Sequence, residues 1–201
     1  MKPKLKLNDI TNLHDARYCS AVGIYLLGFD VKTLGAPAVM TMIEWLSGPE
    51  GVGEFEYETP DEIRELTTAA QLKYVRVPLD YSREDAAKIG LPLIFSAGNA
   101  VLSETGLGEV AELAAAFPEA LFEFAIAESD TEGWAFLQEK GLIERSLLCF
   151  EDPDAVYQML ERAGHKPFAF TLGAFFEEPD GALDYQKCDD FVEQFHELLP
   201  A

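Results

Sequence analysis

The sequence predicts a single (β/α)8 barrel with eight parallel strands and short loops. Eight short segments rich in β-branched or aromatic residues occur in order, and each is followed by a helix-start signal and an amphipathic stretch. No G-x-G-x-x-G motif follows the first segment, whereas a doubly wound open sheet would favour one there. A chain of 201 residues lies at the short limit for a barrel, so we expect residues 1–201 to form one domain without an inserted unit.

The predicted strands are short and apolar, which is typical of parallel strands that are covered on both faces. In chain order they span residues 4–8, 24–29, 52–57, 72–77, 93–96, 121–126, 146–150 and 168–172.

The predicted helices begin at recognisable N-cap signals, because a capping side chain satisfies the free amides of the first turn. Thr59, followed by Pro60 and Glu62, combines a cap, a proline at the first helical position and a capping-box glutamate. Other expected caps are Asn12, Ser82, Ser129 and Asp152. The helices are expected to start at Leu13, Ala38, Pro60, Arg83, Glu104, Asp130, Pro153 and Tyr185.

The charge balance argues against polyanionic partners. The chain has 15 Lys and Arg against 36 Asp and Glu, a formal net charge of -21. Nucleic acid and anionic membranes are bound through clustered Lys and Arg, so we expect neither as a partner. The sequence leaves open a small-molecule ligand at the barrel mouth, a homodimer or a protein partner.

The cysteines indicate a reducing compartment. Cys19, Cys149 and Cys188 are odd in number and widely spaced, without a C-x-x-C pair, so we expect buried free thiols rather than disulfides or a zinc site. No apolar run approaches the roughly 18 residues of a membrane span, and the N-terminal residues lead directly into a predicted strand. We therefore expect a cytoplasmic protein, and no metal or cofactor.

Several segments, in the same order along the chain, resemble phosphoribosylanthranilate isomerase. That family opens with K-x-C-G-I-T, then D-A and G-F, and this chain has K-L-N-D-I-T from Lys6, D-A from Asp15 and G-F from Gly28. V-G-E-F from Val52 is similar to the V-G-V-F of the third strand in the family. Near the end, residues 172–175 and 179–184 resemble S-G-V-E followed by P-G-x-K-D.

The resemblance implies a specific reaction, which needs an acid and a base. The family isomerises an N-linked phosphoribosyl anthranilate to an open-chain enol-ketone in tryptophan biosynthesis, with a Cys at the end of the first strand as base and an Asp at the end of the sixth as acid. Asn8 stands at the Cys position, and its amide only forms hydrogen bonds. The sixth strand lacks an Asp, and Glu123 is its nearest carboxylate. Asp9 is ionisable, but alternation along a strand would point it away from the side that Asn8 faces.

Other departures from the family affect substrate binding. The family's Q-L-H-G at the fourth strand is replaced by R-V-P-L from Arg76, and the S-x-R segment that supplies an arginine for the anthranilate carboxylate becomes residues 33–37, T-L-G-A-P. Barrels usually bind phosphate with the loops after strands seven and eight. These loops are acidic here, with Glu151, Asp152, Glu177, Glu178 and Asp180.

The residues expected at the barrel mouth have alternative interpretations. Candidate substrate-binding residues are Lys6, Asn8, Arg76, Thr171 and Gly173. Lys6 either contacts a ligand or pairs with Glu123 or another barrel carboxylate, and Arg76 either contacts an anion or forms an internal ion pair. Carboxylates that follow predicted strands could form an acidic mouth that attracts a cation, or could simply be exposed loop residues. They are Asp9, Asp30, Asp80, Glu151 and Glu177.

Three hypotheses of function follow. The favoured one is a degenerate family member that keeps the barrel, has lost the isomerase reaction and acts as a binding or regulatory protein, since barrel stability and mouth chemistry involve different residues. The first alternative is an active isomerase with shifted catalytic groups, Asp9 and Glu123. The second is a repurposed enzyme that acts on a neutral or cationic small molecule.

Overall fold

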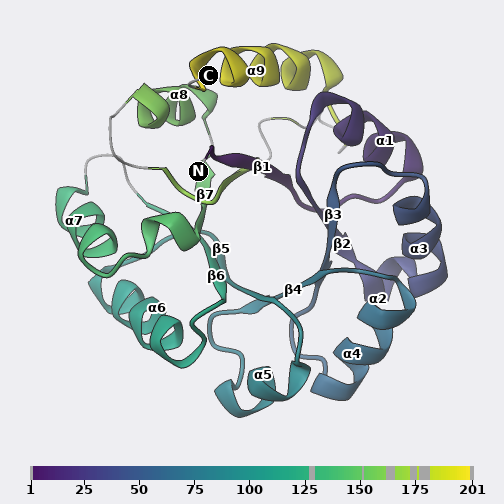
Figure 1. Ribbon diagram of the computed structural model, residues 1–201, viewed down its shortest axis with the longest axis horizontal. Helices are drawn as coiled ribbons and strands as arrows, with labels where there is room; N and C mark the ends of the chain where they lie inside the picture. The colour runs from purple at the N-terminus through teal and green to yellow at the C-terminus, as the bar shows by residue number, and fades with distance from the viewer. Residues whose placement is uncertain are drawn as a thin grey trace.

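The structure is a closed parallel barrel. It is a computed structural model that describes residues 2–126, 130–150, 152–161, 166–172, 176 and 182–199. Its eight strands follow one another around the barrel in chain order, and the last pairs with the first. Figure 1 shows the strands as an inner ring surrounded by the helices. The predicted (β/α)8 fold is confirmed.

Most strands lie where the sequence placed them, within about two residues. They are β1 (Lys4–Leu7), β2 (Leu26–Asp30), β3 (Glu50–Glu54), β4 (Tyr74–Pro78), β5 (Leu93–Val101), β6 (Leu121–Ala125), β7 (Ser146–Phe150) and β8 (Ala169–Leu172). β3 begins at Glu50 and includes Gly51, a weak strand former, because β2 pairs with it from Leu26 onward. β5 is longer than predicted and shifts register between Ser96 and Val101.

The helices begin close to the predicted positions. They are α1 (Leu13–Val22), α2 (Val31–Leu34), α3 (Ala36–Glu44), α4 (Pro60–Ala69), α5 (Arg83–Ile89), α6 (Glu104–Ala116), α7 (Thr131–Glu139), the 3-10 helix η1 (Ile143–Arg145), α8 (Pro153–Glu161) and α9 (Tyr185–Leu198). The Asn12 side chain accepts from the Asp15 amide at 2.9 Å, and Thr59 forms the predicted capping box. Asp130 caps α7, whereas the predicted cap Ser129 lies outside the described residues.

The short helix α2 was not predicted. It begins directly after β2, where the Asp30 carboxylate accepts from the Thr33 amide at 3.0 Å and from the Thr33 hydroxyl at 2.5 Å. Gly35, with a left-handed φ of 82°, separates it from α3, which therefore starts at Ala36 rather than at Ala38. Asp30 thus serves as a helix cap as well as a carboxylate at the mouth.

The barrel interior is layered. Its lower layer is apolar, and its members alternate along their strands with residues that face the helices. They are Leu26, Val52, Ile94, Leu121, Leu147 and Ala169. Two residues further along β5, β6 and β8 the buried side chains become polar, at Ser96, Glu123 and Thr171, and Lys6 on β1 is buried beside Thr171. The larger apolar cluster fills the space between the strands and the helices. The polar side chains therefore lie above a buried apolar layer.

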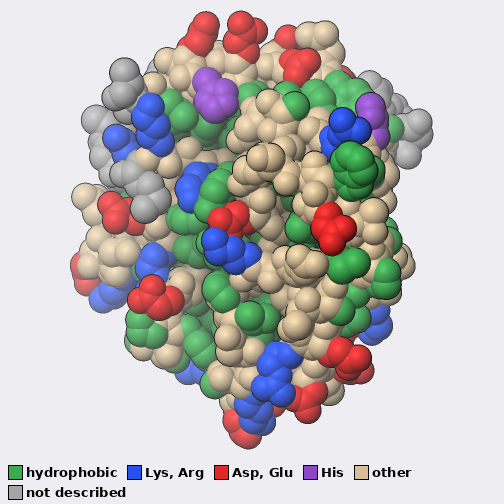
Figure 2. Space-filling view, turned by 45° about the vertical axis from the view of Figure 1, so that its right-hand side comes forward, with side chains coloured by type: hydrophobic (Ala, Val, Ile, Leu, Met, Phe, Trp, Pro, Cys, Tyr) green, Lys and Arg blue, Asp and Glu red, His purple; other side chains and the backbone are tan. Residues whose placement is uncertain are grey.

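The surface agrees with the acidic composition. On the face in Figure 2, Lys and Arg side chains lie singly or in small groups among acidic and apolar ones rather than in one basic patch. The three cysteines are buried and free, as predicted. Among the described residues, no helix is long and apolar enough to cross a membrane.

The capping box of α4 gives a test of the local folding signals. The Thr59 amide donates to the Glu62 carboxylate at 2.9 Å, and the Glu62 amide donates to the Thr59 hydroxyl. We expect Thr59→Ala to lower the free energy of unfolding by about 1 kcal/mol, because it removes the hydroxyl that accepts from the Glu62 amide and donates to the Glu62 carboxylate. The matched control is Thr68→Ala, which changes an exposed threonine in the same helix. Urea unfolding of both variants measures the difference, and equal stabilities would contradict the expectation.

Candidate functional site

One buried carboxylate organises the polar layer of the barrel. Glu123 on β6 is fully buried, and its Oε1 accepts from the Lys6 ammonium at 2.6 Å and from the Thr171 hydroxyl at 2.9 Å. Its Oε2 accepts from the Arg76 Nε at 2.5 Å and from the Ser96 hydroxyl at 2.8 Å. Four donors from β1, β4, β5 and β8 therefore converge on one side chain.

The cations keep Glu123 ionised. Burial alone would raise the pKa of this carboxyl, but the Lys6 ammonium and the Arg76 guanidinium outweigh burial and hold the pKa below its ordinary range. Burial by itself would lower the pKa of Arg76, and Glu123 and Glu54 outweigh that effect and raise it. Glu123 therefore acts as an anion that binds two cations, and it has no proton to donate at neutral pH.

Of the two interpretations of Lys6 and Arg76, the structure supports the internal ion pair for both. The Lys6 side chain is fully buried and donates to Glu123 and to the Asn8 Oδ1. Arg76 pairs with Glu123 while keeping 24% of its side chain exposed, so it also borders the mouth. Asn8 faces inward, as predicted, and its carbonyl oxygen accepts from Lys6.

Glu54, at the end of β3, is a site residue that sequence analysis missed. Its side chain is only 8% exposed, and its Oε1 lies 3.6 Å from the Lys6 ammonium without any hydrogen-bond partner. Burial raises the pKa of this carboxyl, only partly opposed by the Lys6 and Arg76 charges. The signal in the sequence was the alternation of Val52 and Glu54 along one strand, which places Glu54 above the apolar floor.

Gly28 on β2 makes room for Glu54. A Cβ at Gly28 would lie 2.3 Å from the Glu54 Oε1 and 3.1 Å from the Asn8 Oδ1, so a larger residue would displace the carboxylate. The G-F pair that contributes to the family resemblance thus has a steric role here.

Asp9 lies on the same side of the mouth as Glu54. Alternation along a strand predicted that it would point away, but β1 ends at Leu7 and Asp9 has a left-handed φ of 55°. This conformation turns its side chain toward the mouth, and it costs a non-glycine residue about 1 kcal/mol. The strand alternation expected for Asp9 therefore does not hold, because β1 ends before this residue.

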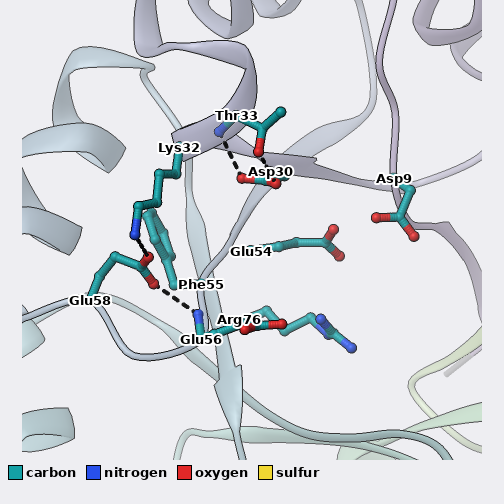
Figure 3. Close-up of a pocket in the computed structure, with 9 residues that line it drawn as sticks. All are labelled: Asp9, Asp30, Lys32, Thr33, Glu54, Phe55, Glu56, Glu58 and Arg76. Carbon is teal, nitrogen blue, oxygen red and sulfur yellow. Dashed lines mark hydrogen bonds and ion pairs between the residues drawn. The ribbon is translucent and has the colours of Figure 1, made fainter.

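A cavity of about 340 Å³ opens between Asp9, α2 and the ends of β3 and β4 (Figure 3). It is lined by Asp9, Asp30, Lys32, Thr33, Glu54, Phe55, Glu56, Glu58 and Arg76. The Lys32 ammonium pairs with Glu58 at 2.7 Å. The volume is in the range of small-molecule sites, and the lining is acidic with one aromatic wall.

The remaining predicted site residues have different positions. Asp9 and Asp30 meet in the cavity, and Asp80 does not line it. Thr171 is buried against Glu123. Gly173, Glu151 and Glu177 lie outside the described residues, as do Glu178 and Asp180.

Cys149 on β7 is a buried free thiol inside the barrel. Burial raises the pKa of its thiol to about 12, and the nearby Glu123 charge adds to the effect. The thiol is thus protonated at neutral pH and is not suited to act as a base there.

Solved structures with this fold include phosphoribosyl anthranilate isomerases. The one from Thermus thermophilus is 20% identical, with 97% of this chain and 99% of that chain covered, at a TM-score of 0.75. A phosphoribosyl anthranilate isomerase in complex with reduced 1-(o-carboxyphenylamino)-1-deoxyribulose 5-phosphate is 18% identical over 97% and 99% of the chains, at a TM-score of 0.79. The 3-hexulose-6-phosphate synthase from Salmonella typhimurium is 12% identical over 98% and 100%, at a TM-score of 0.65.

No family model and no curated protein sequence matches the chain significantly. The structural likeness therefore establishes the fold, and the resemblance to phosphoribosylanthranilate isomerase is confirmed at that level.

Neutralising the two buried carboxylates, Glu123 and Glu54, should change the free energy of unfolding differently. We expect Glu123→Gln to lower the free energy of unfolding by about 3 kcal/mol or more at neutral pH, because Lys6 and Arg76 would remain buried without their counter-ion. We expect Glu54→Gln to be neutral or stabilising at the same pH, because burial disfavours the charged form of Glu54.

The pH dependence separates the two effects. The depressed pKa of Glu123 contributes stability above its unfolded value of about 4.3, and this is lost as the pH falls through the folded value. The raised pKa of Glu54 contributes stability that is full below about 4.3 and is lost as the pH rises through the folded value. The gain from Glu54→Gln should therefore grow with pH in urea unfolding series. Equal responses of the two variants would contradict this assignment.

Proposed function

We propose that this protein is a phosphoribosylanthranilate isomerase-like barrel that has lost the isomerase reaction and acts as a binding or regulatory homologue. One observation carries the proposal. Glu123, the inward carboxylate of β6, is held ionised by Lys6 and Arg76 and is fully buried, so it is unsuited to donate the proton that the reaction requires.

The base of the reaction is also missing. Asn8 stands where the family has its cysteine, and its side-chain oxygen already accepts from Lys6. An amide cannot remove a proton from carbon at neutral pH. The thiol of Cys149 is too weakly acidic to replace it.

The residues near the expected substrate site also support the proposal. The segment after β2 contains no arginine, and Lys32 in α2 pairs with Glu58. The cavity beside it is lined by five carboxylates and by two cations that are both in ion pairs, which disfavours an anionic substrate.

A second function is favoured by one specific observation. Glu54, whose pKa is raised by burial, and Asp9 line the same cavity, and a carboxyl whose protonated form is favoured beside a second carboxyl is an arrangement that acid–base isomerisation uses. An active isomerase with these shifted groups is therefore the alternative. It differs from the pairing of Asp9 and Glu123 that the sequence indicated.

Complementation distinguishes the two functions. The gene is expressed at normal level in a strain that lacks the isomerase, and growth without tryptophan is scored. No growth is expected from the proposal, with an active isomerase as the positive control. Growth that is abolished by Glu54→Gln would establish the alternative instead.

The substitution Asn8→Cys alone should not create isomerase activity. Catalytic groups act as a unit, and the acid, the arginine for the anthranilate carboxylate and a favourable phosphate loop are missing as well. In a steady-state assay with purified protein we expect turnover indistinguishable from that of the unmodified chain. Robust turnover by this single variant would show that the other departures are harmless.

Ribose-phosphate ligands should not bind measurably at millimolar concentration and moderate salt. In the sequence, Glu151 and Glu177 follow strands seven and eight, where barrels usually place phosphate. Two like unit charges about 4 Å apart near a surface repel by roughly 4 kcal/mol at an effective dielectric of about 20, or nearly three decades of affinity.

Calorimetry with the reduced product analogue is the direct measurement, and Glu151→Gly is the informative variant. Micromolar binding by the unmodified protein would overturn both this expectation and much of the case for lost catalysis.

A further inference from the structure

Glu54 is buried in the wall of the mouth cavity, and one of its carboxylate oxygens accepts no hydrogen bond. Its side chain is 8% exposed, and no hydrogen bond reaches its Oε1. The nearest cation, the Lys6 ammonium 3.6 Å away, is beyond hydrogen-bond distance and already donates to Glu123 and Asn8. A buried carboxylate with one unsatisfied oxygen is costly to keep ionised, so a donor that reaches the part of the Glu54 side chain lining the cavity would stabilise it.

The charges around Glu54 indicate that a ligand donating to it would be positively charged. Asp9 and Asp30 face the same cavity, and Figure 3 shows the Glu54 carboxylate between them. The two lining cations have partners, Lys32 at Glu58 and Arg76 at Glu123. The potential inside the cavity is therefore negative, and its low-dielectric walls concentrate that potential.

The shape of the cavity favours an organic cation over a metal ion. No group of three or more His, Cys, Asp and Glu side chains in the described ranges is arranged to hold a metal. The cavity has a volume of about 340 Å³, and the aromatic residue Phe55 is among those that line it. An aromatic wall and separated carboxylates suit a ligand that carries an apolar body and a charged nitrogen group.

We propose that this cavity binds a small organic cation with an ammonium, amidinium or guanidinium group, which donates hydrogen bonds to Glu54. This inference deepens the proposed function, on which it rests, by assigning a ligand class to the retained barrel. Asp9 and Asp30 provide long-range attraction, and Phe55 contacts the apolar body of the ligand. Gly28 is required as well, because a side chain there would displace the Glu54 carboxylate.

Binding should be linked to the ionisation of Glu54. The groups facing it are Lys6 and Asn8 on the β1 side, Asp9 beyond them, Asp30 on β2, Arg76 on β4 and Glu123 on β6. Burial favours the protonated form of Glu54, and a bound cation favours the ionised form. The affinity should therefore increase as the pH rises through the raised pKa of Glu54.

Isothermal titration calorimetry with benzamidine tests the proposal on the full-length protein. Benzamide, which is neutral and of the same shape, and benzoate, which is anionic, are the ligand controls. The variant Glu54→Gln removes the central charge, and Glu65→Gln removes one exposed carboxylate in α4, outside the cavity. Thermal denaturation of each variant verifies folding, and an isomerase assay on the same preparations reports separately on the proposed function.

We expect benzamidine alone to bind, with affinity that increases with pH. Glu54→Gln should weaken binding by about tenfold or more, since a charge-assisted hydrogen bond is lost, and Glu65→Gln should leave it nearly unchanged. Asp9→Asn should give a smaller loss. Absence of benzamidine binding at millimolar concentration, equal binding of benzamide, or equal losses in the Glu54 and Glu65 variants would overturn the proposal, whatever the isomerase assay gives.

Discussion

The carboxylate of Glu123 is the interaction on which the upper half of the barrel depends. Lys6 and Arg76 extend into the interior from β1 and β4, and a buried charge of either kind costs several kcal/mol unless it is paired. Glu123 pairs with both and also accepts from the hydroxyls of Ser96 and Thr171. The bonds that stabilise the polar layer therefore engage each of these charged groups.

Glu54 shows how strongly position determines the state of a carboxyl in this barrel. Both glutamates lie above the apolar floor, and both are near Lys6. Glu123 receives hydrogen bonds from both cations, so its ionised form is favoured, whereas Glu54 is buried 3.6 Å from Lys6 with one oxygen unsatisfied. Glu123 is hydrogen-bonded within the barrel interior, and Glu54 lines the cavity at the mouth.

Sequence patterns predicted the barrel well, because strand and helix signals are local. Thr59 and Asn12 cap the helices that they were expected to cap. The site was less predictable, because it depends on register between distant strands. The pairing of Glu123 with Lys6 joins residues 117 apart, and the left-handed backbone at Asp9 follows from where β1 ends. Glu54 was missed because its environment depends on the space left by Gly28 of a neighbouring strand.

The two sides of the mouth have different constraints. The cavity is built from the ends of β1 to β4 and from α2, whereas phosphate-binding barrels use the loops after strands seven and eight. Arg76 connects the cavity with the barrel interior, because it lines the cavity and also pairs with Glu123. A ligand bound at Glu54 would therefore act on a cation whose other partner lies inside the barrel. Since the apolar floor beneath does not depend on either side, the mouth can change its ligand while the fold remains.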